Sequence, residues 1–177
     1  MNVSLVRVDN RLIHGQILEA WVPYVQATCI VVADDDVAND FFRETVIRMA
    51  VPREIEVVIT GVADFVKNHS YEDRSGEKTI ILFSTLRAAV KAFNLGFHYD
   101  SLNIGNVYEE EGAVQWARSI RLGERDISDL VTLNNAGVQI ELRCVPQDKP
   151  VSFQESLKKA KRKLPGLTAI KGRDVAP

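Results

Sequence analysis

VSLVRVDNRLIHGQI (Val3–Ile17) changes character twice within fifteen residues. Its first six residues form a β-branched, apolar run, the middle is a loop rich in polar side chains, and an amphipathic, helix-like pattern begins at Ile17. A strand that passes through a short loop into a helix is the repeating unit of α/β folds. We therefore expect the rest of the chain to repeat this unit.

The strand pattern recurs five times after the first run. Short runs rich in Val, Ile and Thr lie at Cys29–Ala33, Ile55–Thr60, Thr79–Phe83, Ser101–Ile104 and Gln139–Val145. The runs VSLVRV, CIVVA and TIILF are apolar nearly throughout, which is typical of strands covered on both faces. The pattern predicts an α/β, three-layer fold with a mainly parallel sheet and helices on both faces.

Helical spacing fills the gaps between these runs. We expect helices at Ile17–Val22, closed by Pro23, at Asp40–Ala50, at Thr85–Phe93, and within GERDISDLVTLNNAG (residues 123–137). Gly137 is placed to adopt the left-handed conformation after the last of these helices. AVQWARSIRL (residues 113–122) fits a helix or a strand, and we favour a strand, in antiparallel orientation.

Length and composition indicate an ordinary globular protein. The 177 residues suit one domain, residues 1–177, with a basic helix and tail from about residue 151 to Pro177. A net charge of −2 gives no cationic surplus to match phosphates, so we expect no nucleic-acid partner. Cys29 and Cys144 lie in apolar runs, which predicts buried, reduced thiols in a cytosolic protein.

Membrane and export signals are not evident in the sequence. The start MNVSLVRVDN lacks the basic and apolar regions of a signal peptide, and no apolar run approaches the roughly 20 residues that span a bilayer. We therefore expect a chain that is neither secreted nor embedded in a membrane by itself.

The loop between Val8 and Ile17 matches none of the common catalytic loops. Gly15 is its only glycine, whereas dinucleotide and nucleotide loops need G-x-G-x-x-G or G-x-x-x-x-G-K-[ST]. The G-x-S-x-G pattern of a nucleophile elbow is missing, and His69 and His98 lie in unrelated segments, which disfavours a zinc site. We expect neither a metal nor a cofactor.

His14 can itself serve as the nucleophile of this loop. A neutral imidazole is abundant near pH 7, and its natural electrophile here is a phosphoryl group. Phosphoryl transfer needs positioning and charge stabilisation, which Arg11 and the backbone amides of Gly15 and Gln16 can supply at a helix start. Arg7 could add charge, or it could point away along its strand.

RVDNRLIHGQI (Arg7–Ile17) resembles the active-site loop of the IIB components of mannose-family (mannose, fructose, sorbose) sugar phosphotransferase systems. The resemblance continues through IVVADDDVAND, LNIGN and GERDISDLVTLNNAGVQIELRCVP, and so covers the chain up to about Pro146. It implies that His14 accepts a phosphoryl group, on Nδ1, from a phosphohistidine of the IIA component. Arg11 and the loop around Asp9 and Asn10 would form the phosphate site.

The same resemblance implies partners and a location. The phosphoryl group would pass to a sugar carried by the membrane components IIC and IID, which places the chain in the cytoplasm, peripherally associated with the membrane. A homodimer is compatible with the family. Asn10 stands where many members have Asp, and the C-terminal KKAKRKLPGLTAIKGRDVAP is longer and more basic than the family pattern.

Single polar residues of these segments also fit ordinary structural roles. A lone histidine at a helix start is often a capping residue, and Arg11 could be an ordinary surface cation. Ser84 could donate to a phosphoryl oxygen, although a hydroxyl just before a helix more often caps it. For Asp34 to Asp36 we favour a solvated turn. Asn103, Gly105 and Asn106 follow another strand and could lie near a ligand.

Two alternative functions use the same loop. One is a phosphorylation-dependent regulatory module of this family that never delivers phosphate to sugar. The second is an α/β enzyme in which His14 acts as a general base on a metabolite.

Overall fold

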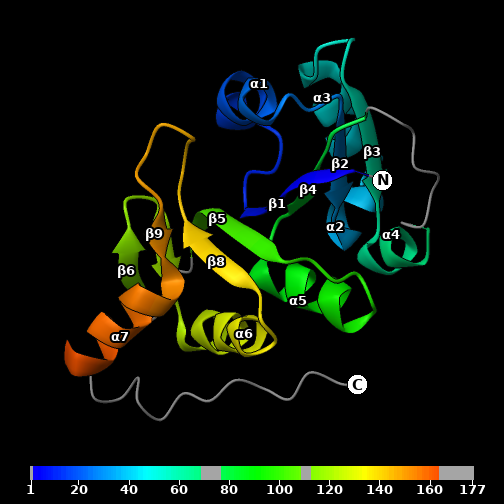
Figure 1. Ribbon diagram of the computed structural model, residues 1–177. Helices are drawn as coiled ribbons and strands as arrows, with labels where there is room; N and C mark the ends of the chain where they lie inside the picture. Colours follow the sequence, from blue (N-terminus) through cyan, green and yellow to red (C-terminus); the bar gives the residue numbers. More distant parts are fainter. Residues whose placement is uncertain (1, 69–76, 109–112, 164–177) are drawn as a thin grey trace.

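The computed structural model describes residues 2–68, 77–108 and 113–163 (Figure 1). Its strands are β1 (Val3–Asp9), β2 (Cys29–Ala33), β3 (Glu56–Thr60), β4 (Thr79–Phe83), β5 (Ser101–Tyr108), β6 (Val114–Ala117), β7 (Ile120–Leu122), β8 (Gln139–Leu142) and β9 (Val151–Ser152). Its helices are the π-helix η1 (Gln16–Trp21), α1 (Val22–Val25), α2 (Asp35–Ala38), α3 (Phe41–Ala50), α4 (Val62–Asn68), α5 (Leu86–Asn94), α6 (Glu124–Asn135) and α7 (Phe153–Lys163).

The strands form one mixed, mostly parallel sheet. Its order is β3-β2-β4-β1-β5-β7-β6, and β8 pairs with the first half of β5. The pairs β6–β7 and β8–β9 are antiparallel. The predicted fold class is confirmed. Residues 113–122, for which we favoured an antiparallel strand over a helix, form the β6–β7 hairpin.

Apolar side chains of the central strands alternate between two cores. Ile30 and Ile80 face one core with Trp21 of η1, whereas Val31 and Ile81 face the other core with Phe93 of α5. Every residue of β2 and of β4 is buried. Figure 1 shows α1 and α3 on one side of the sheet and α4, α5 and α6 on the other. The three predicted layers are therefore present around these strands.

The second layer of helices is incomplete beyond β1. Leu102 and Ile104 of β5 and Ile140 and Leu142 of β8 all face the core under α5 and α6. No described residue of β5 or β8 belongs to the core under α1 and α3. Among the described residues, one face of these two strands thus has no helix packed into that core, a local exception within the predicted three layers.

Pro23 does not end its helix, contrary to the prediction. The N–H of Val22 donates to the carbonyl of Ile17, a five-residue spacing that closes η1, and α1 continues to Val25 with Pro23 in its first turn. A proline is tolerated there because the N–H groups of the first helical residues have no intrahelical acceptor. The N–H that proline lacks would therefore have made no hydrogen bond within the helix. The helix ends instead at Gln26, in the left-handed conformation at φ 57°.

The turn at Asp34–Asp36 is structural and partly buried, so the prediction of a solvated turn is wrong for Asp34. Its buried carboxylate accepts the N–H of Val37 at 2.8 Å and caps α2. Asp35 accepts Lys91 Nζ at 2.6 Å and the N–H of Val62 at 2.8 Å. The hydrogen bond from Lys91 and that from Val62 lower the pKa of Asp35 from its usual value.

The other predicted elements are largely confirmed. The helices at Asp40–Ala50 and Thr85–Phe93 appear as α3 and α5, with Asp40 and Thr85 as their N-caps. Gly137 follows α6 with φ 96°, as expected for a left-handed residue at that place. The helix expected from about residue 151 is α7, whereas His69 and the tail after residue 163 lie outside the described residues.

Candidate functional site

The loop from Asn10 to Gly15 leaves the carboxyl end of β1 and enters η1. Two hydrogen bonds to Asp9 hold the first turn of this loop. The Asp9 carbonyl accepts the N–H of Leu12 at 2.9 Å, and its Oδ1 accepts the N–H of Arg11 at 3.2 Å. Leu12 adopts the left-handed conformation at φ 53°, which is rare for a leucine, and its side chain is buried in the core under α1. This turn sends the chain back across the sheet edge and leaves His14 at the helix start.

His14 lies among hydrogen-bond acceptors. Its Nδ1 is 2.8 Å from the carbonyl oxygen of Leu12, and its Nε2 is 3.3 Å from Gln16 Oε1 and 3.8 Å from Asp9 Oδ2. A carbonyl oxygen can only accept, so the contact with Leu12 requires a proton on Nδ1. In the neutral ring of this geometry the free lone pair is therefore on Nε2. The His14 side chain is 16% exposed, so solvent reaches the ring.

Arg11 provides the accessible cation of the loop. Its side chain is 46% exposed, its Nη2 donates to Gln16 Oε1 at 2.7 Å, and its Nε is 3.7 Å from Asp9 Oδ1. Gln16 thus contacts both Arg11 and His14, which places the guanidinium and the imidazole side by side. A dianionic group on the ring would lie within reach of this cation.

Asp9 and Arg7 form a fully buried ion pair behind the loop. Arg7 Nη2 donates to Asp9 Oδ2 at 2.8 Å, and both side chains are 0% exposed. Burial lowers the pKa of the Arg7 guanidinium from its ordinary value, and the neighbouring Asp9 carboxylate opposes that shift. An arginine nevertheless stays charged in proteins, so Arg7 places a buried positive charge against Asp9, next to His14.

Further acceptors hold Arg7 in place on the far side of the ion pair. Its Nη1 donates to Asn103 Oδ1 and, at 3.0 Å, to the carbonyl of Arg143, while its Nη2 also donates to the carbonyl of Cys144 at 3.0 Å. The Arg7 guanidinium carbon lies 5.1 Å from the centre of the Trp21 ring, a cation–π contact. The printed partners of its terminal donors are all inside the protein, and one of them, Asp9 Oδ2, is also 3.8 Å from His14 Nε2.

Gly105 makes room for the Arg7 guanidinium. A Cβ atom at position 105 would overlap the terminal atoms of the Arg7 side chain. Because Arg7 is held by four acceptors, it cannot move aside without losing buried hydrogen bonds. The absence of a side chain at position 105 is therefore a condition for the buried ion pair.

Gly105→Ala is expected to lower the free energy of unfolding by about 3 kcal/mol, the upper end of the cost of overpacking. Urea unfolding followed by circular dichroism measures the loss. Gly15→Ala is the control, because a Cβ there meets only the Glu19 carboxyl group at 3.9 Å, and a change below about 0.5 kcal/mol is expected. Equal stability of Gly105→Ala and the parent chain would refute the packing argument.

The remaining predicted site residues lie around this centre. Asn10 is tied to β5, since its N–H donates to the Asn106 carbonyl at 2.9 Å and its Oδ1 accepts from the Asn106 side chain. Ser84 directly follows Phe83, which pairs with Val8 of β1, so it lies at the same sheet edge as the loop. Thr85, not Ser84, caps α5. The amides of Gly15 and Gln16 have no hydrogen-bond partner among the described residues.

Several groups of the centre were not singled out from the sequence. The carbonyl oxygens of Leu12, Arg143 and Cys144 bind His14 or Arg7, and backbone acceptors leave no signal in a sequence. Trp21 is a core residue with 1% exposure. Its additional contact with Arg7 follows only from the fold.

Two further observations concern metals and membranes. Within residues 2–68, 77–108 and 113–163, no three His, Cys, Asp or Glu side chains gather closely enough to hold a metal ion. In the same part of the chain, no helix has both the length and the apolar character needed to cross a bilayer.

Comparisons with known proteins agree on one family. The family model of the PTS system sorbose subfamily IIB component matches residues 3–167. The PTS system fructose-specific EIIB component of Bacillus subtilis is 32% identical over 158 residues, which cover 89% of this chain and 97% of that protein. The mannose-specific EIIAB component of Escherichia coli is 27% identical over 159 residues, 90% of this chain but 49% of the longer relative.

A solved structure has the same fold. The crystal structure of the IIBSor domain of the sorbose permease from Klebsiella pneumoniae matches with a TM-score of 0.82 at 29% identity, covering 90% of this chain and 98% of that domain.

Proposed function

The chain belongs to the sorbose subfamily of PTS IIB components, and we propose that it carries phosphoryl groups on His14, from a phosphohistidine of a IIA component to a sugar. The observation that carries this proposal is the arrangement of His14, Arg11 and Gln16 at the carboxyl edge of the sheet. A solvent-accessible imidazole there has an exposed guanidinium beside it. Open α/β sheets bind their ligands at this edge.

The proposed reaction is an exchange of one N–P bond for another. A lone pair of the His14 ring attacks the phosphorus of the donor phosphohistidine, and the electrons of the breaking N–P bond return to the donor imidazole. In the second step a sugar hydroxyl attacks the phosphorus and gives its proton to water. The electrons of the breaking N–P bond return to the His14 ring, which leaves as neutral imidazole with its proton on Nε2. No cofactor is needed because the transferred group only requires position and charge stabilisation.

Arg11 and the helix start stabilise the transferred group in this proposal. The Arg11 guanidinium can turn from Gln16 to the phosphoryl oxygens, and charge-assisted hydrogen bonds of this kind are stronger than neutral ones. The amides of Gly15 and Gln16, unpaired among the described residues, add donors at the positive end of η1. Ser84 lies at the same edge and is a further donor in this scheme.

Asp9 and Arg7 have a positioning role in this proposal. A buried carboxylate repels a phosphate, so Asp9 acts on the ring, where its Oδ2 is 3.8 Å from Nε2. Arg7 holds that carboxylate in place and does not contact the transferred group. Asn10 fixes the loop to β5 through Asn106.

Phosphorylation on Nδ1, implied by the resemblance, sets a condition on the ring. The Nδ1 proton shared with the Leu12 carbonyl must leave, and the ring must turn from that oxygen to expose the lone pair. The proton then resides on Nε2, where Gln16 Oε1 and the Asp9 carboxylate can accept it. Nδ1 phosphorylation thus predicts a broken contact between His14 and Leu12 in the phosphorylated protein.

The partners follow from the same proposal. A IIA component supplies the phosphoryl group, and the membrane components IIC and IID hold the sugar, so the chain works in the cytoplasm at the membrane surface. The name of the E. coli relative, EIIAB, joins a IIA and a IIB component in one protein. In the present chain the described residues form only the IIB fold.

Reconstitution tests delivery to sugar. The chain is phosphorylated by its IIA component and mixed with membranes that contain the cognate IIC and IID, and sugar phosphate is measured. Stoichiometric loss of protein phosphate with gain of sugar phosphate is the expected result. A stable phosphoprotein that gives no sugar phosphate with active membranes would favour the regulatory module, and turnover of a metabolite by the unphosphorylated chain would favour the general base.

Arg11→Gln is expected to slow phosphorylation of His14 about 10²-fold, the usual effect of removing one donor that stabilises transferred charge. Arg11→Lys should recover part of the rate because it keeps the charge but loses the planar fork. Rapid-quench kinetics with a phosphorylated IIA donor measure both variants. Arg43→Gln, an exposed position on α3, is the matched control, and an unchanged rate in Arg11→Gln would remove Arg11 from the site.

A further inference from the structure

Helix α3 presents an apolar stripe to solvent. Phe42, Val46 and Met49 follow one another at i, i+4 and i+7, the spacing that places side chains on one face of a helix. Their exposed fractions are 76%, 50% and 82%, and that of the neighbouring Phe41 is 83%. A surface helix of a globular protein usually turns such a stripe towards the core. In α3 the stripe, Phe41, Phe42, Val46 and Met49, faces outwards instead.

The opposite side of α3 makes the contacts with the sheet. No residue of the helix is buried, and Ile47 packs against the core under α1. Arg48 Nη1 donates to the carbonyl of Val57 in the edge strand β3 at 2.8 Å, and Arg48 Nη2 is 2.8 Å from Glu44 Oε1. The polar contacts of α3 therefore lie towards the sheet, whereas its largest apolar side chains lie in solvent.

The stripe is large enough for a contact between proteins. A phenylalanine side chain can bury about 150–250 Å², so these four exposed side chains present roughly 500 Å² of apolar surface. A patch of this size is at the upper end for a monomeric protein. Two such stripes facing each other would bury about 1,000 Å², which is the lower limit for a specific interface.

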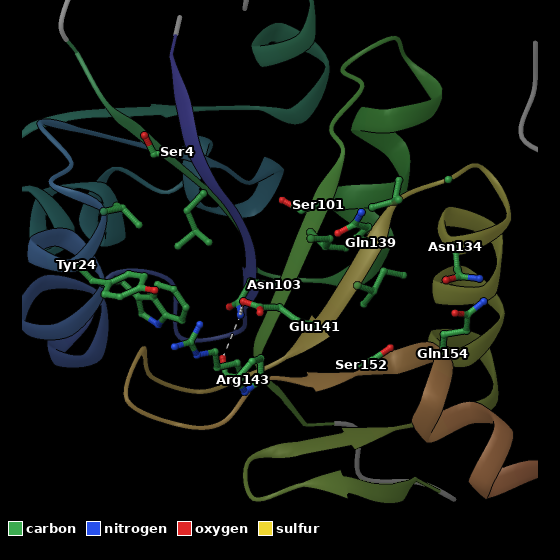
Figure 2. A pocket seen from close by; sticks show the side chains of 18 residues that line it. Ser4, Tyr24, Ser101, Asn103, Asn134, Gln139, Glu141, Arg143, Ser152 and Gln154 are labelled. Atoms are coloured by element: carbon green, nitrogen blue, oxygen red, sulfur yellow. Dashed lines mark hydrogen bonds between the residues drawn. The ribbon is translucent and has the colours of Figure 1, made fainter.

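The open face of β5 and β8 is a poor partner for this stripe. Figure 2 shows Ser101, Asn103, Gln139 and Glu141 on that face. Burying these polar groups against phenylalanine and methionine side chains would cost free energy, because an apolar surface offers no hydrogen bonds. Within the described part of the chain, the stripe itself is the apolar surface that matches in size.

We propose that the stripe of α3 joins two copies of this chain in an antiparallel, two-fold dimer. In such a pair the same surface of both copies meets, so Phe42 of one chain packs against Met49 of the other. Contacts between a thioether and an aromatic ring are favourable. Val46, in the middle of the helix, then lies close to its own copy at the two-fold axis.

Charges at the two ends of α3 select the antiparallel orientation. The Asp40 carboxylate accepts the N–H groups of Phe42 and Arg43 at the start of the helix, and the exposed Arg53 follows its end. Antiparallel packing places the acidic end of one helix beside the basic end of its copy and opposes the two helix dipoles. A parallel pair would bring like charges together at both ends.

The dimer leaves the site at His14 open. Helix α3 connects the carboxyl end of β2 with the amino end of the parallel strand β3, so it runs back along the sheet. Val46 and Met49 therefore lie away from the edge that holds His14, which makes a phosphoryl donor docked at that edge a poor match for the stripe. The proposal does not depend on phosphoryl transfer, and His14→Ala should dimerise as the parent chain does.

Sedimentation equilibrium of the full, unphosphorylated chain tests the proposal. We expect the average mass to rise with concentration from the 19.8 kDa of one chain towards twice that value. The rise should occur below about 100 µM, because interfaces near the lower size limit still reach micromolar affinity. A constant mass of one chain over this range would overturn the proposal.

Val46→Glu is the diagnostic variant, because it brings two carboxylates together at the two-fold axis. It should weaken dimerisation at least about 100-fold, the usual effect of like charges across an interface. Leu95→Glu, at an apolar position that is 51% exposed after α5, is the matched control and should dimerise as the parent chain does. Met49→Glu repeats the test at a more exposed position, and circular dichroism verifies the fold of each variant. Equal dimerisation of both α3 variants and the parent chain would overturn the proposal.

Val46→Lys distinguishes a two-fold pair from docking of α3 onto a different surface. Alone, this variant should be as monomeric as Val46→Glu. An equal mixture of the two variants should form a heterodimer, because opposite charges then meet at the axis. A mixture that stays monomeric while the parent chain dimerises would show that α3 does not face its own copy, and the proposal would be wrong.

Discussion

His14→Ala is expected to accept no phosphoryl group from a phosphorylated IIA donor, and sugar phosphorylation through the chain is expected to fall at least about 10³-fold. The reason is chemical, since the imidazole forms the covalent intermediate and no neighbouring side chain can replace it. The described contacts of His14 are with Leu12, Gln16 and Asp9, and none of these offers a comparable nucleophile. Intact mass and radiolabel incorporation measure the loss.

His98→Ala is the matched control for this variant. His98 lies in a loop after α5, where its ring contacts Phe93 edge to face at 4.8 Å, far in the sequence from the loop of His14. Its phosphorylation and sugar transfer should equal those of the parent chain. Full transfer to sugar by His14→Ala would mean that the phosphocarrier assignment of His14 is wrong.

Asp9→Ala is expected to cost about 3–5 kcal/mol of stability, the usual loss when one partner of a buried ion pair is removed. Arg7 would keep its charge in a fully buried place while losing the carboxylate at 2.8 Å. The Arg11 amide would also lose its acceptor, so the turn that presents His14 would loosen. Urea unfolding of the unphosphorylated chain measures the change.

A double variant separates the ion pair from other roles of Asp9. Arg7→Met combined with Asp9→Leu removes both charges and replaces them with apolar side chains, which is often close to neutral for a buried pair. It should be more stable than Asp9→Ala by at least about 1.5 kcal/mol, yet slow in phosphoryl transfer because His14 has lost its orienting carboxylate. If the double variant lost as much stability as the two single variants together, the two side chains would act independently.

The central strands could be predicted from the sequence because their residues obey a local rule. CIVVA and TIILF are apolar at every position, and the structure buries each of them. The uncovered face of β5 and β8 was harder, since Ser101, Asn103, Gln139 and Glu141 alternate with core residues in runs too short to establish a pattern. Whether a helix covers a strand face depends on the order of the strands in the sheet. That order is not determined by short runs of sequence.

Pro23 and Asp34 show two further limits of sequence reasoning. A proline usually ends a helix, but the five-residue spacing of η1 places Pro23 in a first turn, where its missing N–H has no consequence. Three consecutive aspartates suggest a solvated turn, yet Asp34 is 4% exposed because it caps α2 against the core. In both places the outcome depends on where the next helix begins, which the residue type alone does not determine.

The candidate site likewise contains residues that the sequence could indicate and residues that only the fold brings together. His14, Arg11 and Gln16 are within five residues of one another, so a single loop brings them together and the sequence could indicate them. The burial of Arg7 depends on Gly105 and on two carbonyl groups after β8, about a hundred residues away or more. The buried position of Arg7 therefore required the fold.

The most direct test of the account is to locate the phosphoryl group. The ¹⁵N-histidine-labelled chain is incubated with a phosphorylated cognate IIA component, and ³¹P and ¹⁵N spectra are combined with peptide mapping under alkaline conditions. The account predicts one acid-labile, alkali-stable phosphoryl group, on the His14 ring alone. No phosphorylation by a donor that is demonstrably active, or a phosphoryl group on any other residue, would contradict it.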